Sequence, residues 1–399
     1  MWNLFKKGGA PAQRIYLDYA SATPLLPEVL RAMAPYWSER FGNPGALYAE
    51  GVDAARALET ARVECARALS VQAAEVTFTS GGTESNNLAI LGLLKQKIQE
   101  TPGGTFHVIS MAIEHSSILE PLVELARQGV QVSYVSVRAD GVIDLAALKA
   151  ALTPQTVLVS VHLANSEIGV IQPLRDIARL LDETYGKEKR PVLHSDAAQA
   201  PLFLEVSLER LGVDMLTLDG QKMGGPKGVG ALVHRKHIPL CSIIGGGGQE
   251  RGLRSGTEPV PLIVGFTAAL SAAVRGREER VRRVKELRDR FLGELLQRLP
   301  QAILNGSATE RIANNVNVSI PGVDTEFLVL RLDHEGIAVS TKSTCLSDEV
   351  ASSVVAALGK GEEVARSTLR ITLGTDTTWS ELARTLDVLE RLVANLDIR

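Results

Sequence analysis

Cysteine is scarce in this chain of 399 residues, which contains only Cys65, Cys241 and Cys345. The three residues lie far apart in the sequence, and none of them belongs to a CxxC pair. This spacing argues against a disulfide framework and against a structural zinc site. We therefore expect a protein of a reducing compartment with no metal centre.

Long apolar runs and an excess of either charge are also absent. No stretch approaches the roughly 18 apolar residues that cross a bilayer, and residues 1–9 (MWNLFKKGG) do not resemble a signal peptide. The net charge of −3 provides no general attraction to nucleic acid or to an anionic membrane. These absences predict a cytoplasmic protein that binds neither of them.

What is present is the composition of an ordinary globular protein, with 45% apolar and 22% charged residues. The chain is too long for one compact core, so two domains are expected. Short β-branched runs alternate with helical segments, and many runs are continuously apolar, as is typical of strands covered on both faces. The pattern predicts an α/β fold with a mostly parallel sheet. The expected strands are 76–79, 106–111, 130–137, 157–163, 192–195, 215–218, 230–234 and 240–244, and the clearest helices between them are 84–99, 116–128 and 173–185.

The character of the sequence changes after Gly256. Residues 262–299 predict one long helix whose second half is rich in Arg and Glu, as a solvated helix face is. The remaining elements are expected to be strands at 315–320 and 368–373, helices at 325–335 and 380–397, and a loop at 340–353. We predict a large domain at 15–260 and a small α+β domain at 261–399, with residues 1–30 as a candidate addition to the small domain.

The segment 218–228 (LDGQKMGGPKG) places Lys222 at the end of a buried strand, before a glycine-rich turn. An amine in that position can meet a cofactor aldehyde, because desolvation lowers the pKa of lysine and leaves the amine able to form an imine. The spacing by itself favours a simpler interpretation, a lysine in a solvated loop.

Two more segments follow strands. In 79–87 (TSGGTESNN), Gly82 and Thr83 open a helix, where backbone N–H groups and the helix dipole suit an anion; a purely structural turn is the alternative. In 194–199 (HSDAAQ), Asp196 ends an apolar strand, at the edge where parallel sheets bind ligands. Its carboxylate could pair with a protonated pyridine nitrogen or simply cap a helix.

Two single residues are weaker candidates. His115 closes an apolar run and could stack on a flat cofactor ring or move protons, although a lone histidine is more often an ordinary core or surface residue. Arg370, in the expected strand 368–373, could bind a carboxylate through two hydrogen bonds, with a surface ion pair as the alternative.

Two polar segments have the composition of functional loops. Cys345 lies in 340–348 (STKSTCLSD), where a thiolate favoured by Lys342 could attack a substrate. Residues 245–257 (GGGGQERGLRSGT) form a cationic, glycine-rich loop that suits a phosphate or a subunit contact. By contrast, Cys65 and Cys241 lie in apolar surroundings and are expected to be packing residues.

In their order along the chain, these segments resemble the cysteine desulfurases of iron–sulfur cluster assembly, within the class V aminotransferase superfamily. The resemblance extends from residue 15 to about residue 374. It implies the fold of the fold-type I pyridoxal-phosphate enzymes, in which a mostly parallel seven-stranded sheet forms the large domain beside a smaller α+β domain. The most specific matches are SGGTESNNLAI, EH at 114–115, SEIGV, SDAAQ, GPKGVGAL, ERGLRSGT and the cysteine segment.

The resemblance also implies roles for individual residues. Lys222 would bind pyridoxal 5'-phosphate covalently and move protons, and Arg370 would bind the carboxylate of L-cysteine. Cys345 would attack the substrate sulfur and keep it as a persulfide, and L-alanine would be released. The other implied cofactor contacts are His115, Asp196, Gln199 and Asn165 or Ser166 at the ring, and Gly82, Thr83, Gln221 and, from the second subunit of a homodimer, Thr257 at the phosphate.

The chain departs from the family's pattern at several of these positions. Asp219 and Gln221 stand where the family usually has a serine and a histidine that hold the phosphate, and an ionised Asp219 would repel a dianion. Ser166 stands in place of an asparagine. The other departures are Gln249 and Tyr48 for histidines and Lys342 for a glycine.

The sequence thus predicts a cysteine desulfurase that passes sulfur to a scaffold or carrier protein. One alternative is a lyase, aminotransferase or epimerase of the same fold, whose reactions need no thiol, so Cys345 argues against it. The second alternative is a degenerate homologue that acts as a scaffold, and the departures at Asp219 and Gln221 motivate it.

Overall fold

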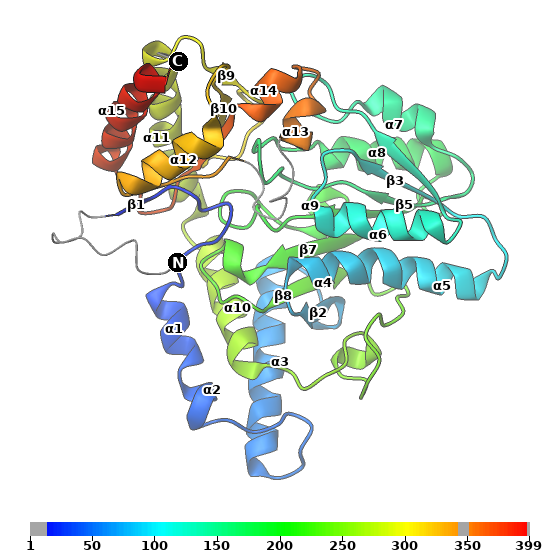
Figure 1. Ribbon diagram of the computed structural model, residues 1–399. Coiled ribbons are helices and arrows are strands. Elements are labelled where there is room, and N and C mark those ends of the chain that lie inside the picture. Colours follow the sequence, from blue (N-terminus) through cyan, green and yellow to red (C-terminus); the bar gives the residue numbers. More distant parts are fainter. Residues whose placement is uncertain (1–13, 342–350, 397–399) are drawn as a thin grey trace.

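The computed structural model describes residues 14–341 and 351–396, and its largest element is a seven-stranded sheet (Figure 1). The strand order is β2-β8-β7-β6-β5-β3-β4. The strands from β7 to β4 in this order run parallel, and β8 is antiparallel to both of its neighbours. The predicted mostly parallel sheet of seven strands is therefore confirmed. Its strands are β2 (Val76–Thr79), β3 (His107–Met111), β4 (Gln131–Val135), β5 (Thr156–Ser160), β6 (Val192–Asp196), β7 (Met215–Asp219) and β8 (Gly230–His234).

Helices cover both faces of this sheet (Figure 1). On β7, Leu216 and Leu218 belong to the apolar cluster on one face, whereas Met215 belongs to the cluster on the other. This alternation explains why the strands read as continuous apolar runs. The first face packs against α3 (Ala49–Leu69), α8 (Leu174–Tyr185) and α10 (Val260–Val274), and the second against α6 (Ser116–Arg127) and the unbroken helical run of α4 (Gly82–Asn87), η2 (Leu88–Gly92) and α5 (Leu93–Glu100). The shorter helices of this part are α1 (Pro27–Met33), α2 (Pro35–Ser38), η1 (Ala73–Glu75), α7 (Leu145–Ala151) and α9 (Leu208–Leu211).

The strand predicted at 240–244 is wrong. These residues instead lie alongside the helical run of α4, η2 and α5. The Cys241 N–H donates to the Gly92 carbonyl oxygen (3.1 Å), and Lys95 Nζ donates to the Ser242 carbonyl oxygen (3.1 Å). Only glycine allows this approach, since a Cβ on Gly92 would lie 2.8 Å from the Cys241 oxygen. The apolar run packs on a helix rather than extending the sheet.

A second apolar cluster lies beside the large sheet, around a three-stranded antiparallel sheet (β12-β10-β9) and a parallel pair (β1-β11). The β1-β11 pair brings the start of the described chain, Ile15 and Leu17, into this cluster. The predicted strands and helices of the C-terminal part occur within a residue or two of their expected bounds. The elements are β1 (Ile15–Tyr16), α11 (Arg277–Arg298), β9 (Ile303–Leu304), β10 (Asn315–Ser319), α12 (Thr325–His334), β11 (Ile337–Ala338), α13 (Ser353–Ala356), α14 (Glu362–Arg366), β12 (Thr368–Thr372) and α15 (Trp379–Leu396).

The helix predicted at 262–299 is in fact two helices, α10 and α11, bent by 72°. Gly276 takes the left-handed conformation between them (φ 62°), which glycine adopts at little cost. Arg280 closes the end of α10 by donating to the carbonyl oxygens of Ala272, Ala273 and Arg275. Among the described residues no single helix is long and apolar enough to cross a membrane, and α10 and α11 reach that length only as this bent pair.

The division into two domains stays a proposal. Phe266 of α10 packs in the large-sheet cluster, whereas Phe291 of α11 packs in the second cluster. This packing favours a boundary at the bend near Gly276 rather than at residue 260, with β1 added to the small domain. The charged face of α11 is mostly exposed, as predicted, but Arg288 is buried and donates to the Ile312 carbonyl oxygen (3.2 Å).

A buried histidine makes the stability of this fold depend on pH. The ring of His194, on β6, lies between the hydroxyls of Ser160 (2.9 Å) and Thr217 (3.1 Å), and burial lowers its pKa to about 4. Below about pH 6.5 the His194 ring is protonated in the unfolded chain, whereas in the folded chain it stays neutral until about pH 4. The folded state is therefore destabilised as the pH falls from about 6.5 to 4.

We predict that His194→Gln removes this part of the acid sensitivity. Between pH 7 and pH 4, the free energy of unfolding should fall by about 3 kcal/mol less in the variant than in the wild type. Urea denaturation at several pH values measures this difference, and the carboxylates shared by both proteins cancel from it. An equal loss in the two proteins would contradict the assignment.

Candidate active site

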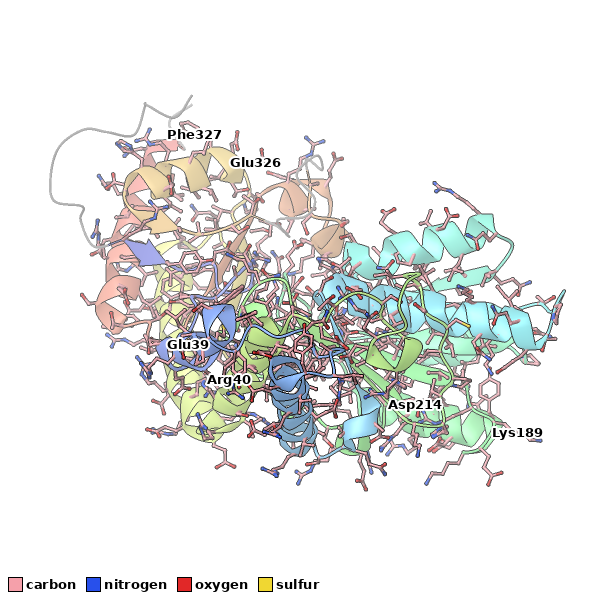
Figure 2. All side chains as sticks on the ribbon, turned by 90° about the horizontal axis from the view of Figure 1, so that it is seen from below. Glu39, Arg40, Lys189, Asp214, Glu326 and Phe327 are labelled. Carbon is pink, nitrogen blue, oxygen red and sulfur yellow. The ribbon has the colours of Figure 1, made fainter. Side chains whose placement is uncertain are left out.

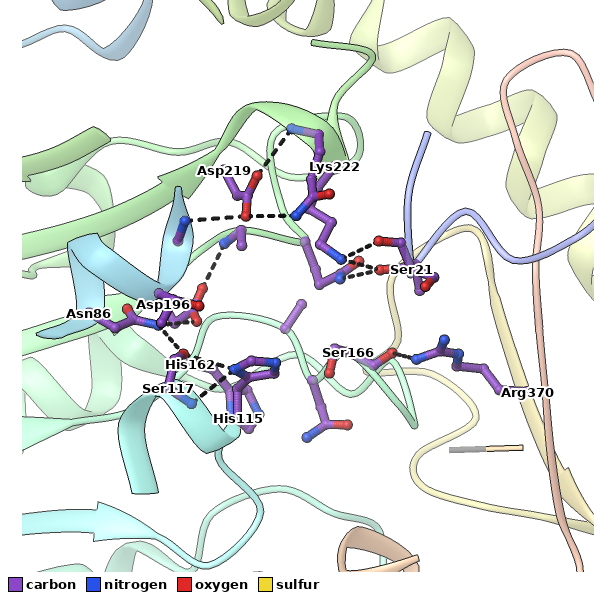
Figure 3. Close-up of a pocket in the computed structure, with 18 residues that line it drawn as sticks. Ser21, Asn86, His115, Ser117, His162, Ser166, Asp196, Asp219, Lys222 and Arg370 are labelled. Atoms are coloured by element: carbon purple, nitrogen blue, oxygen red, sulfur yellow. Dashed lines mark hydrogen bonds between the residues drawn. The ribbon is translucent and has the colours of Figure 1, made fainter. Parts of the chain in front are cut away.

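A pocket lies at the carboxyl ends of the parallel strands, the edge at which open α/β sheets bind ligands (Figure 3). Residues that follow β3, β5, β6 and β7 line it, and Arg370 reaches it from the second sheet. It brings together most of the predicted site residues, namely Gly82, Thr83, His115, Asn165, Ser166, Asp196, Gln199, Gln221, Lys222 and Arg370.

Lys222 ends the short turn η3 (Gly220–Lys222), which follows β7 directly. Its Nζ donates hydrogen bonds to the carbonyl oxygens of Ala20 (2.9 Å) and Ser21 (2.5 Å). The amide of Gln199 donates to the same Ala20 oxygen (2.9 Å). The lysine is thus half-buried in the pocket wall, as the cofactor interpretation of the sequence requires, and is not part of a solvated loop.

Four side chains form a hydrogen-bonded chain across the pocket (Figure 3). Asn86 Nδ2 donates to Asp196 Oδ2 (2.7 Å) and to Ser117 Oγ (2.8 Å), and Ser117 contacts His115 Nδ1 through both its hydroxyl (2.8 Å) and its N–H (3.1 Å). Because His115 Nδ1 accepts the Ser117 N–H, a neutral ring carries its proton on Nε2. The network therefore fixes the orientation of Asp196 and of His115 together.

Asn86 and Ser117 are absent from the predicted site residues. Asn86 lies four positions after Gly82, a spacing that puts both on one face of α4, and this periodicity was the available signal. The predicted alternative for Asp196, a helix cap, does not occur, since its Oδ1 accepts the Ala198 N–H (2.9 Å) in a turn.

The first turn of α4 faces the end of β7. Gly82 and Thr83 open this helix, whose first N–H groups have no partner within the helix. Asp219 Oδ2 accepts the Gly82 N–H (3.2 Å) and the Gln221 side-chain amide (3.4 Å), and Asp219 Oδ1 accepts the Gln221 N–H (3.0 Å). A carboxylate therefore lies at the end of the pocket where an anion is best held.

Arg370 is buried, so the surface ion pair considered from sequence is wrong. Its Nη2 donates to Asp18 Oδ1 (2.8 Å) and its Nη1 to the Ser166 carbonyl oxygen (3.0 Å). Its Nε is buried without a hydrogen-bond partner in the described structure. Asp18, which is not among the predicted site residues, thus orients the guanidinium.

Asn165 and Ser166 share one turn but differ in what they can contact. The Asn165 amide donates to the Ile113 carbonyl oxygen and accepts the N–H groups of Glu167 and Ile168, each at 2.9 Å. These bonds hold the turn itself. Of the two residues, Ser166 is therefore the better placed for a ligand contact.

A buried acid–base pair adjoins His115. Glu114 Oε1 lies 3.0 Å from His162 Nδ1 and accepts the His162 backbone N–H (2.8 Å). His162 lines the pocket, although it is not among the predicted site residues. Its only signal in the sequence is its place two residues after the strand β5.

The glycine-rich loop 245–257 is fixed to the rest of the chain by two ion pairs. Glu250, in the turn η4 (Glu250–Gly252), forms a buried bidentate pair with Arg62 (2.7 and 2.8 Å), and Arg254 pairs with Glu84 of α4 (3.1 Å). Thr257, at the end of the loop, is exposed and does not line the pocket of its own chain.

The three cysteines differ in their surroundings. Cys65 is buried in α3, and burial raises its pKa to about 12, in keeping with an inert packing residue. Cys241 is partly buried, with its Sγ 3.1 Å from the side-chain oxygen of Gln96. Cys345 and Lys342 lie outside the described residues.

The described residues that flank the segment 342–350 are both attached beside the pocket. Ser340 exchanges two backbone hydrogen bonds with Arg370 (3.1 and 2.6 Å). On the other side, Ser352 donates to the carboxylate of Glu167, the neighbour of the pocket residue Ser166. The described residues on both sides of this segment therefore lie next to the pocket wall.

Comparison with known proteins agrees with this geometry. The family model described as aminotransferase class-V matches residues 15–384. The curated cysteine desulfurase IscS of Dictyoglomus turgidum is 40% identical over 385 residues, which cover 96% of this chain and 95% of that protein.

Two solved structures share the fold over most of the chain. A NifS-like protein has a TM-score of 0.88 at 33% identity and covers 96% of this chain and 100% of its own. A structure described as SspA in complex with cysteine has a TM-score of 0.77 at 33% identity and covers 91% of this chain and 100% of its own. From the family match, the relative and the shared fold it follows that this chain belongs to the class V aminotransferases and, within them, to the cysteine desulfurases.

Proposed function

We propose that this chain is a pyridoxal-phosphate-dependent cysteine desulfurase that transfers the sulfur of L-cysteine to Cys345. The observation that carries the proposal is the convergence of Lys222, Asp196, His115 and Arg370 on one pocket. The reaction balances without an external oxidant, because the enzyme thiol and L-cysteine give an enzyme persulfide and L-alanine. The substrate carbon–sulfur bond breaks, a sulfur–sulfur bond forms, and the substrate carbon gains a hydrogen.

The donor set of the pocket fits the cofactor. Lys222 provides an amine, Asp196 a carboxylate for a protonated pyridine nitrogen, and His115 a flat ring beside them. When bound, pyridoxal phosphate supplies an electron sink that acidifies the α-hydrogen of an amino acid. The remaining cofactor contacts are assigned to Gln199 and Ser166 at the ring and to Gly82, Thr83 and Gln221 at the phosphate.

Lys222 and Arg370 have separate roles in proton transfer and in substrate binding. Lys222 Nζ, held by the carbonyl oxygens of Ala20 and Ser21, accepts and returns a proton within the pocket. Arg370 binds the substrate carboxylate, since its guanidinium lines the pocket and is oriented by Asp18.

The thiol of Cys345 receives the sulfur and carries it to an acceptor protein, a scaffold or a carrier. The attachment of Ser340 and Ser352 beside the pocket supports this role, because these two residues flank the segment that contains Cys345. The thiol must remain reduced between turnovers, so we assign the enzyme to a reducing compartment, the cytoplasm.

The proposed enzyme is a homodimer in which Thr257 serves the pocket of the partner. Large apolar side chains are exposed around α2 and the start of α3, among them Phe41 (69%) and Leu47 (96%), and such a patch is typical of a protein interface. Figure 2 shows Glu39 and Arg40 in this region, far from Phe327 on α12. The exposed position of Thr257 outside its own pocket is consistent with a contact across the interface.

We predict that Cys345→Ala abolishes sulfur transfer, because no other thiol lies in the cysteine segment. Alanine and sulfide formed from L-cysteine should fall by at least 100-fold, a loss of about 3 kcal/mol in transition-state stabilisation. Cys241→Ala is the matched control and should retain wild-type rates. Full turnover by the Cys345 variant would exclude the persulfide mechanism.

We predict that the purified chain, mixed with pyridoxal phosphate, gains a visible absorption band that Lys222→Ala lacks, because Lys222 is the one lysine among the described residues that line the pocket. Lys227→Ala, five residues further along the same glycine-rich turn, serves as the control and should keep the band. Absence of the band from the wild type would favour the other candidate, a homologue that acts as a scaffold.

We predict that Leu47→Glu combined with Phe41→Glu converts the dimer to a monomer, since two charges in an apolar interface weaken association by at least tenfold. Light scattering coupled to gel filtration measures the mass. Leu330→Glu, at an exposed leucine on α12 (67%), should leave the dimer intact. An unchanged dimer in the double variant would place the interface elsewhere.

A further inference from the structure

One carboxylate in the pocket has no role in the chemistry proposed for the site. Asp219 is the last residue of β7 and is buried at the first turn of α4 (Figure 3). Its hydrogen-bond partners are amide groups, those of Gly82 and Gln221. Within the described residues Asp219 forms no ion pair, so its charge is balanced only by these dipoles.

The position of Asp219 coincides with the place that suits a phosphate group. The helical run that begins at Gly82 continues unbroken to Glu100, so its amino end presents N–H groups without a partner in the helix, and a positive dipole. At the other end of the pocket, Asn86 of the same helix holds Asp196, about 6 Å further along the helix axis. A cofactor paired with Asp196 through its ring would therefore have its phosphate held by the residues near Gly82 and Asp219.

Asp219 already uses donors that a phosphate would need. Its Oδ2 accepts the Gly82 N–H, and the two Gln221 donors are directed to the same carboxylate. The fit is close, since a Cβ on Gly82 would lie 3.2 Å from Oδ2. A dianion bound here must both displace these bonds and approach a second negative charge in a poorly solvated site.

We propose that Asp219 sets the cofactor selectivity of this pocket by weakening the binding of the phosphate group while leaving the binding of the ring unchanged. The chain then holds pyridoxal phosphate less tightly than its other contacts would allow. The preference for pyridoxal phosphate over unphosphorylated pyridoxal is correspondingly small. This inference rests on the proposed function, because both compounds are bound through Lys222.

The test compares two ligands rather than two activities. Wild type, Asp219→Asn and Asp219→Ser are titrated with pyridoxal phosphate and, separately, with pyridoxal, and binding is followed by visible absorption. Asn keeps the shape of the side chain and one acceptor, and removes only the charge. We expect both variants to bind pyridoxal phosphate at least tenfold more tightly and pyridoxal within about twofold of the wild type.

Asp176→Asn, an exposed carboxylate on α8, makes the same change in net charge and should alter neither affinity. The pyridoxal titration also reports whether each variant is folded, because it requires an intact pocket. An equal change for both ligands in the Asp219 variants, or no change for either, would overturn the selectivity role.

The two hypotheses fail in different ways. Lys222-dependent binding of both ligands with an unaltered ratio in Asp219→Asn overturns the selectivity role and leaves the proposed function standing. Failure of every variant to bind either compound overturns both.

Discussion

The position of Lys222 depends on the segment that follows β1. Asp18 in this segment forms an ion pair with Arg370 of the three-stranded sheet. The carbonyl oxygens of Ala20 and Ser21 accept hydrogen bonds from the Lys222 amine, which follows β7 of the large sheet. Thr23 adds bonds to the Gln221 carbonyl oxygen through both its N–H and its hydroxyl. The parallel pairing of β1 with β11 fixes the start of this segment, so residues at the two ends of the sequence together complete the pocket.

The large sheet could be predicted because its strands are buried on both faces, which leaves continuous apolar runs in the sequence. The same signal gave the false strand at 240–244, since an apolar run packed on a helix has no distinct period. The break at Gly276 was missed for another reason. Arg280 stabilises the bend by donating to carbonyl groups five to eight residues before it in the chain. Gly276 itself stands between Arg275 and Arg277, so the local sequence resembles a continuous charged helix face.

The candidate site was predictable where a residue ends a strand or opens a helix, as Lys222, Asp196 and Gly82 do. Its supporting residues were not. Asn86 and Asp18 contribute through hydrogen bonds to Asp196 and Arg370, which lie 110 and 352 positions further along the chain. A local sequence pattern does not reveal contacts between such distant residues. Asp219 shows the converse case, in which the sequence marked an unusual residue and the structure shows what its carboxylate contacts.

The hydrogen bonds that hold the Lys222 amine determine which substitutions this site tolerates. Its partners at Ala20 and Ser21 are main-chain oxygens, which every amino acid possesses. Substitution of either side chain leaves these acceptors in place as long as the backbone path is kept. Substitutions at these two positions are therefore expected to leave the amine in place. A comparison of side-chain identities at positions 20 and 21 would not reveal that the segment still holds the lysine.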